Sequence, residues 1–142
     1  MKPETPPPHR LALDLATAWS RLEARLSASV SLRGVSFAEF RLLRTLADLP
    51  GASATRVDLA SALGMSPSGV TRALQPLEKI GVVTTVRSER DARLALAALT
   101  EAGREVVADC SQAVDDALRA LLAPGNVETP TLTDLVGALA PR

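Results

Sequence analysis

The segment VDLASALGMSPSGVTRAL, residues 57–74, constrains the fold of this chain more than any other stretch. Apolar residues lie four positions apart on both sides of Gly64, as they do on the inner faces of two short helices. They are Leu59 and Leu63 before the glycine and Val70 and Leu74 after it. Ala60 is small enough to let the two helices cross closely, and Gly64 stands where the chain must reverse. The pattern predicts a helix-turn-helix, which presents its second helix outward.

The start of that second helix carries polar and small residues. Ser66 is a good N-cap, and Pro67 suits the first turn because its missing N–H would have had no partner there. The unpaired N–H groups and the positive end of the helix dipole favour a phosphate group. Arg72 and Gln75 are long enough to reach base edges in a major groove. We therefore expect DNA contacts from Ser66, Pro67, Ser68, Thr71, Arg72 and Gln75.

Pro76 is the unusual residue of this helix. A proline inside a helix loses the hydrogen bond to the carbonyl four residues earlier, here that of Arg72, at a cost of roughly 3 kcal/mol in an unsupported helix. We expect a bend that separates the DNA-facing first turns from the packed end LEKIGVV, residues 77–83.

Helix signals cover most of the remaining chain. Apolar residues recur every three or four positions from His9 to Ser31, which predicts a long first helix. Ser36 and Glu39 form a capping box for a second helix, which ends at LPG. The first helix of the helix-turn-helix starts near Thr55. Two further helices are expected, from Thr100 to the sequence APG and from Thr131 to Ala140.

Between the second helix of the motif and Thr100 the pattern becomes that of strands. VVTTVR and RLALAAL are rich in β-branched residues or alternate, and the polar SERDA lies between them, so they predict a hairpin. Its tip is rich in charge: Arg87, Arg90 and Arg93 cluster there with Glu89 and Asp91. After a helix-turn-helix this is typical of a wing whose arginines enter a minor groove while an acid orients one of them. A solvated hairpin of mixed charge is the alternative.

Charge is distributed unevenly along the chain. The whole sequence holds 16 basic and 16 acidic side chains, so bulk charge alone does not indicate a nucleic-acid binder. From Thr55 to Arg104, however, seven basic residues exceed five acidic ones, and from Glu105 onward two basic residues stand against six acidic ones. The middle of the chain therefore suits phosphate, and the C-terminal part does not.

Several other classes of protein fit the sequence poorly. One histidine, one cysteine and the lack of a glycine-rich phosphate loop argue against an enzyme, a metal site or a cofactor. No aromatic residue follows Phe40, so the stacking platforms of a single-strand or RNA binder are missing. No apolar run is long enough to cross a bilayer, and MKPETPPPHR lacks the apolar core of a signal peptide. We expect a cytoplasmic protein with no membrane partner.

The run from the helix-turn-helix through LEKIGVV, RDAR and LTEAG resembles the MarR family of winged-helix bacterial transcriptional regulators. The most specific elements are Asp91 and Arg93, followed at the right distance by Leu99, Thr100 and Gly103. The resemblance implies that Arg93 contacts the minor groove and that Asp91 holds neighbouring arginines in place. It also implies structural roles for Leu99, Thr100 and Gly103.

The sequence departs from the family where many members have a basic residue just after the equivalent of Val83. Thr84 and Thr85 stand there instead. Because each lost phosphate contact weakens binding and lowers its salt dependence, we expect weaker backbone contacts from this chain.

The predicted fold is mainly α with a small β-hairpin wing. We expect a flexible leader over residues 1–8 and a single MarR-like domain over 9–142. Within it, 36–99 would form the winged helix, and 9–31 and 102–142 would be dimerisation helices. The residues themselves also indicate a dimer, because these amphipathic flanking helices have no obvious partner within one chain. A two-fold dimer sets its recognition helices about 34 Å apart and reads an inverted repeat.

The expected function is sequence-specific binding of double-stranded DNA by a homodimer, at a pseudo-palindromic operator. The resemblance suggests a repressor released by a small ligand or a stress signal. The alternative is a winged helix that serves as a protein-interaction module without specific DNA binding.

An effector pocket, as the resemblance suggests, would lie near Trp19, Phe37, Phe40 and Arg41. The simpler interpretation, which we favour, is that these aromatic residues belong to the core. Cys110 lies on an apolar helical stripe with no adjacent basic residue, so we expect a buried structural thiol rather than a redox sensor. His9 is expected to be inert in the leader.

Overall fold

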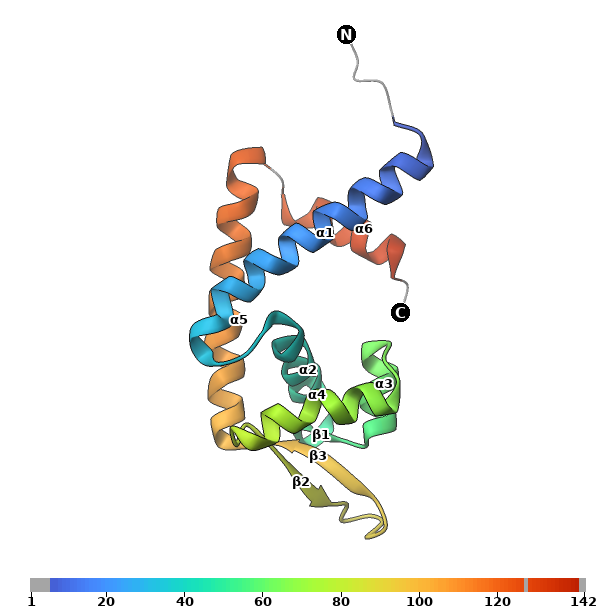
Figure 1. The fold of residues 1–142 in the computed structure, drawn as a ribbon, viewed down its shortest axis with the longest axis vertical. Helices are drawn as coiled ribbons and strands as arrows, with labels where there is room; N and C mark the ends of the chain where they lie inside the picture. Colours follow the sequence, from blue (N-terminus) through green and yellow to red (C-terminus); the bar gives the residue numbers. More distant parts are fainter. Residues whose placement is uncertain (1–5, 127, 141–142) are drawn as a thin grey trace.

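The computed structural model describes residues 6–126 and 128–140 (Figure 1). The helices are α1 (Pro8–Val30), α2 (Phe37–Asp48), α3 (Arg56–Leu63), α4 (Pro67–Lys79), α5 (Glu101–Leu122) and α6 (Thr129–Leu139). The strands are β1 (Ser53–Ala54), β2 (Val83–Arg87) and β3 (Ala95–Leu99), and short 3-10 turns η1 (Ser31–Arg33), η2 (Pro50–Ala52) and η3 (Ala123–Gly125) join some of these elements. No helix within the described residues is long and apolar enough to cross a membrane. The prediction of a mainly helical fold with a small β wing is confirmed.

The helix-turn-helix forms as the sequence predicts. Thr55 caps α3 by accepting a hydrogen bond from the N–H of Asp58 (3.1 Å), and Ser66 caps α4 through the N–H of Gly69 (3.1 Å). Gly64 ends α3 with φ of +65°, a left-handed conformation that an L side chain rarely adopts. The four spaced apolar residues are buried between the two helices, together with Ala60.

The remaining helices also begin close to their predicted starts. The capping box of α2 is complete: the Ser36 hydroxyl accepts from the N–H of Glu39 (3.1 Å), and the Glu39 carboxylate accepts from the N–H of Ser36 (2.7 Å). The first helix starts at Pro8, so Pro8 and His9 belong to α1 rather than to the leader. Residues 1–5 of the expected leader lie outside the described residues.

The helix α4 continues through Pro76 and ends at Lys79. Pro76 is exposed, as are Arg72 and Gln75 on the same helix. The carbonyl that loses its helical partner therefore lies on the water-facing side, where solvent can bond to it. Beyond the proline, the Pro76 carbonyl accepts from the N–H of Ile80 (3.2 Å), so the helical pattern resumes at once.

Within the described residues the sheet has three strands in the order β1-β3-β2, all antiparallel. The predicted hairpin is β2 and β3, with Val83 opposite Leu99 and Arg87 opposite Ala95. The strand β1, in which Ser53 and Ala54 pair with β3, was not predicted. A strand of two residues has no periodicity from which it could be predicted.

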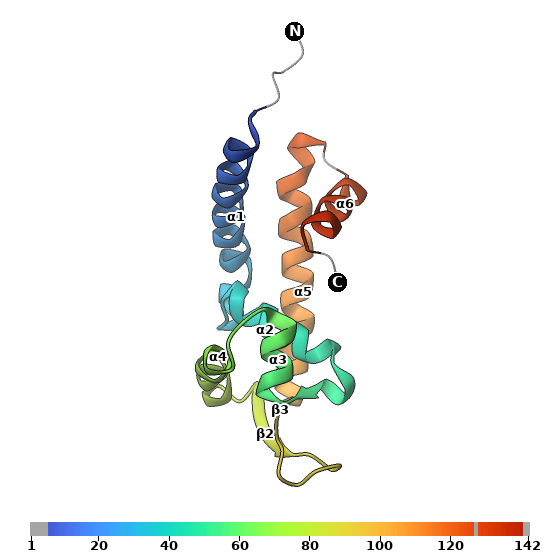
Figure 2. The ribbon, with the colours of Figure 1, turned by 90° about the vertical axis from the view of Figure 1, so that its right-hand side faces the viewer.

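The core lies at one end of the molecule. Buried apolar side chains come from the last part of α1, from α2 to α4, from the sheet and from the first half of α5. Figure 2 shows that α5 runs along the molecule from this core to the opposite end, where α6 and the start of α1 lie. Among the described residues, no side chain is buried in α1 before Leu26 or beyond Cys110 in the C-terminal part.

Candidate nucleic-acid interface

The N-terminal end of α4 forms an exposed polar surface. Ser66, Pro67 and Ser68 are exposed, and the hydroxyl oxygens of Ser66 and Ser68 lie 3.2 Å apart. Thr71 is half-buried and donates its hydroxyl to the Pro67 carbonyl (3.0 Å). Gly69 is close to its neighbours, because an added Cβ would lie 3.1 Å from the Ser66 hydroxyl oxygen. Ser66, Ser68, Gly69 and Thr71 thus give the start of the helix a surface of small side chains, beside which the larger Met65 lies partly exposed.

Two long polar side chains follow on the same face. Ser68, Arg72 and Gln75 are spaced by four and three residues, which places them in one row along a helix. Arg72 and Gln75 are exposed, and among the described residues no carboxylate lies within 4.0 Å of the Arg72 guanidinium. Both side chains are available to an outside partner.

The wing tip is held together mainly through the backbone. The hydroxyl of Ser88 accepts from the N–H groups of Arg90 (3.3 Å) and Asp91 (3.4 Å). The Asp91 carboxylate accepts from the backbone N–H of Arg93 (3.0 Å), and the Arg87 guanidinium donates to the carbonyl of Ala92 (2.8 Å). This differs from the expected role of Asp91, which here fixes the backbone rather than an arginine side chain.

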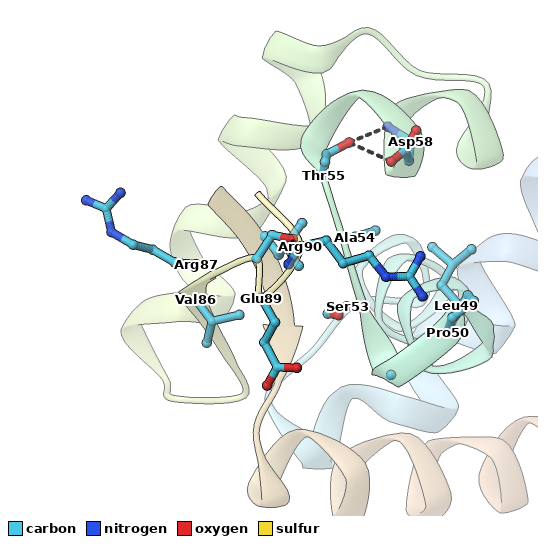
Figure 3. A pocket seen from close by; sticks show the side chains of 13 residues that line it. Leu49, Pro50, Ser53, Ala54, Thr55, Asp58, Val86, Arg87, Glu89 and Arg90 are labelled. Atoms are coloured by element: carbon cyan, nitrogen blue, oxygen red, sulfur yellow. Dashed lines mark hydrogen bonds between the residues drawn. The ribbon is translucent and has the colours of Figure 1, made fainter. Parts of the chain in front are cut away.

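The wing arginines project to different sides. In the part of the chain that the structure describes, the guanidinium groups of Arg87, Arg90 and Arg93 form no ion pair within 4.0 Å. Figure 3 shows Arg87 pointing away from an open hollow of about 830 Å³ that separates the wing from the segment Leu49–Asp58, whereas Arg90 extends across it. Two positive groups thus flank the wing and are open to an anionic partner.

The residues of the predicted effector pocket do not form one group. The rings of Trp19, Phe37 and Phe40 lie in a row, with centroids 6.3 Å and 6.2 Å apart. Phe37 and Phe40 are buried, which agrees with their assignment to the core, and Trp19 is 46% exposed. Arg41 instead donates to the Leu63 carbonyl at the turn of the helix-turn-helix (3.4 Å) and lines a small hollow of about 110 Å³.

Cys110 is fully buried, as expected. Burial raises the pKa of its thiol above the usual 9.0, and the carboxylate of Asp109 adds to this effect. The guanidinium of Arg33 acts in the opposite direction. No basic residue adjoins Cys110 in the sequence, and Arg33 comes near it only through the fold.

Thr100 and Gly103 make close contacts at the junction between α4, β2 and α5. The Thr100 hydroxyl donates to the Gly81 carbonyl (2.7 Å) and accepts from the N–H of Gly103 (3.0 Å). A Cβ on Gly103 would lie 2.1 Å from the Val82 carbonyl oxygen, so only glycine fits there. Leu99 is buried beside it. These residues fix the base of the wing, in agreement with the structural role implied for them.

Three polar residues meet between α3, α4 and β2, and the sequence did not predict that they would do so. The Thr85 hydroxyl donates to the Oε1 atom of Glu78 (3.0 Å), and the Arg56 guanidinium lies 3.6 Å from the same oxygen. No motif marks this group, because the three residues are of common types and lie on three different elements, with Arg56 far from the other two in sequence. Among the described residues, no group of three or more His, Cys, Asp or Glu side chains gathers as a metal site would require.

Comparison with known proteins supports the assignment of the fold. The MarR family model matches residues 33–94, which span α2, the helix-turn-helix, β2 and the wing tip and end before β3. No curated protein sequence matches the chain significantly.

Solved structures resemble nearly the whole chain. AbsC, a MarR family transcriptional regulator from Streptomyces coelicolor, has a TM-score of 0.79 at 23% identity, over 99% of this chain and 95% of that one. A MarR mutant from E. coli complexed with operator DNA has a TM-score of 0.79 at 24% identity, over 93% and 94% of the chains. Sco3205, a MarR family transcriptional regulator from S. coelicolor in complex with DNA, has a TM-score of 0.79 at 25% identity, over 96% of this chain and 87% of that one. The resemblance to the MarR family is confirmed.

Proposed function

From the MarR-family fold that this chain has, we propose that it binds double-stranded DNA and regulates transcription. The observation that carries the proposal is the exposed row of Ser68, Arg72 and Gln75 on α4, next to the wing. Among the described residues, no carboxylate lies within 4.0 Å of the guanidinium groups of the wing arginines. A helix with such a face fits a major groove, and arginines on a wing fit the adjacent minor groove. Two of the similar structures hold DNA.

Within this proposal the roles of the site residues divide. Arg72 and Gln75 read base edges, and Ser66, Pro67, Ser68 and Thr71 let the helix end approach phosphates. Arg87, Arg90 and Arg93 contact the backbone or the minor groove, and Asp91 keeps the wing tip in shape.

A homodimer is the second part of the proposal. Large apolar side chains remain exposed at the end of the molecule away from the wing, where a monomer leaves them in water. On α1 these are Leu11, Leu13, Leu15 and Trp19, and on α6 they are Leu135, Val136 and Leu139. A second copy that covers both helices would remove this surface from water and leave both copies of α4 free for DNA.

We further propose that the protein acts in the cytoplasm as a repressor, and that a small molecule or a stress signal relieves the repression. The partly exposed Trp19, at the end of the aromatic row, is where an effector would meet both α1 and α2. Because the chain has one tryptophan and no tyrosine, a bound effector would change the intrinsic fluorescence directly.

Selection from random DNA tests the proposal. Purified full-length protein is incubated with random duplexes at two salt concentrations, and the bound fraction is sequenced. We expect an inverted repeat with half-sites one helical turn apart and weaker recovery at the higher salt, because phosphate contacts release counterions. A folded protein that enriches no sequence would contradict specific DNA binding and would favour the protein-interaction module instead.

A further inference from the structure

The wing is joined to the rest of the molecule mainly at its base. In β2 only Val83 is buried, and the side chains from Thr84 to Arg87 are exposed. The outer part of β2 is therefore held by its pairing with β3 and by few contacts with the body (Figure 1). A hairpin of this kind can swing about its base unless a side chain fixes it.

Thr85 lies on the face of the hairpin that turns toward the body. Side chains alternate along a strand, so Val83 and Thr85 share one face, and their partners across the ladder are Leu99 and Ala97, both buried. Thr84 lies on the opposite face. Thr85 bonds to Glu78 of α4 on this face (3.0 Å), whereas Arg87, further out on the same face, donates to the Ala92 carbonyl of the wing itself (2.8 Å).

The acceptor of that bond is itself held in place. The same carboxylate oxygen of Glu78 lies 3.6 Å from the Arg56 guanidinium, which belongs to α3. The side chains of Arg56 and Glu78 are 29% and 34% exposed, so both are partly shielded from water and less free to move than a fully exposed pair. One carboxylate oxygen therefore connects both helices of the helix-turn-helix to the wing.

We propose that Glu78 is a positioning residue, which through Thr85 and with support from Arg56 fixes the wing relative to the recognition helix α4. The proposal rests on the proposed function, because a fixed wing matters when α4 and the wing must enter neighbouring grooves together. A wing that moves freely must lose this freedom on binding, which lowers affinity. The effect is limited by the strength of one exposed hydrogen bond, so we expect about a fivefold change in Kd.

The decisive variant is Thr85→Val, which removes the hydroxyl but keeps the shape and suits a strand. Thr85→Ser keeps the hydroxyl and should behave as the wild type. Thr84→Val makes the same change one residue earlier, on the opposite face, where no partner is found within the described part. It is the matched control.

The position of the wing is measured first, without DNA. Spin labels are attached to cysteines introduced at the exposed Ala62 of α3 and Ala92 of the wing, while the buried Cys110 is left in place. Labelled chains are mixed with an excess of unlabelled chains, so that only distances within one chain contribute. We expect a narrow distribution of distances between the two spin labels for the wild type, Thr85→Ser and Thr84→Val. For Thr85→Val we expect a broader distribution.

Affinity for the selected DNA is measured next on the same four proteins. A broader distribution with about fivefold weaker binding for Thr85→Val alone supports the proposal. If the label-to-label distance distributions of Thr85→Val and Thr84→Val are equal, the Thr85–Glu78 hydrogen bond does not fix the wing, and the proposal is overturned. A broader distribution with unchanged affinity would overturn its role in positioning. Failure of the proposed function gives another result, because the wild-type protein then binds no DNA, whether the label-to-label distance distribution is narrow or broad.

Discussion

Under the proposed function, Arg72 and Arg93 divide the work of binding between the helix α4 and the wing. Arg72 stands on the exposed face of α4 without a carboxylate partner among the described residues, whereas Arg93 is tied through its backbone N–H to Asp91 at the wing tip (3.0 Å). A side chain on the recognition helix can distinguish bases in the major groove. One on the wing reaches the backbone and the minor groove, where less sequence information is available.

Alanine substitutions should separate these two roles. Arg72→Ala should weaken binding to the selected site by about 1–3 kcal/mol and relax the preference at one base position. Arg93→Ala should weaken binding to selected DNA and to random DNA by similar factors. Titration of both DNAs at fixed salt measures this. Arg44→Ala, which removes an exposed arginine paired with Asp48 (2.6 Å), controls for the lost charge. Equal losses on both DNAs for Arg72→Ala would contradict the division.

Gly103 is a test of the junction below the wing. Gly103→Ala brings a methyl group against the Val82 carbonyl oxygen, at 2.1 Å before any shift, so α5 and the start of β2 must move apart. We expect a loss of about 1–3 kcal/mol in the free energy of unfolding, measured by denaturant titration. Gly137→Ala is the control, because an added Cβ there meets no atom within 4 Å and a helical alanine is favoured. Equal stability of the two variants would refute the close contact.

Cys110 should be unreactive in the folded protein. Burial, the largest effect, raises the pKa of its thiol above 9.0, so little thiolate forms at pH 8 and reagents cannot reach it. The folded protein binds this proton more tightly, so the stabilisation is complete below pH 9.0 and is lost as the pH rises through the folded-state pKa. Reaction with an aromatic disulfide should be slow at pH 8 and fast in denaturant. Fast reaction of the native protein would show that the thiol is accessible.

At the scale of elements, α4 is one helix with two different parts. Its first turns carry exposed polar residues around the single buried Val70, and its second half buries Leu74 and Leu77 against the core. Pro76 stands between these two leucines and faces water, so its missing N–H costs a bond only on the outer side of the helix. The helix tolerates the proline because its inner face is held by packing.

The first helix carries the prediction that concerns the dimer. Trp19 is 46% exposed in a single chain, and it is the only tryptophan. If a second copy covers α1, the Trp19 emission should shift to the blue at concentrations where the dimer forms and return to the red on dilution. Sedimentation on the same samples gives the state of association. Dissociation without any change in emission would place Trp19 outside the interface.

The helices could be predicted from sequence because local signals define them. Ser36, Thr55, Ser66 and Thr100 each cap the helix that follows, and Gly64 takes the left-handed conformation that ends α3. The strand β1 and the Arg56–Glu78–Thr85 contact could not be predicted. Both depend on which segments the tertiary structure brings together, and residues of common type leave no local pattern. The same reason explains why Arg41 lies at the turn rather than with the aromatic row.

At the scale of the whole molecule, the exposed apolar residues of α1 and α6 lie at the end of α5 that is opposite the wing (Figure 2). The start of α1 and the helix α6 form one end, and the wing lies at the other. If two copies make contact at the first end, related by a two-fold axis, both winged helices would point in the same direction along that axis. Each copy would then meet one half of a symmetric DNA site.

Hydroxyl-radical footprinting of the full-length protein on its selected duplex tests the central claim most directly. Two symmetric protected segments, with centres about 10–10.5 base pairs apart, are expected if two copies of α4 enter successive major grooves. The flanks should show added protection in the minor groove where the wings lie. A single protected segment, or none with a folded dimer at saturating concentration, would contradict a dimeric regulator that reads DNA through α4 and the wing.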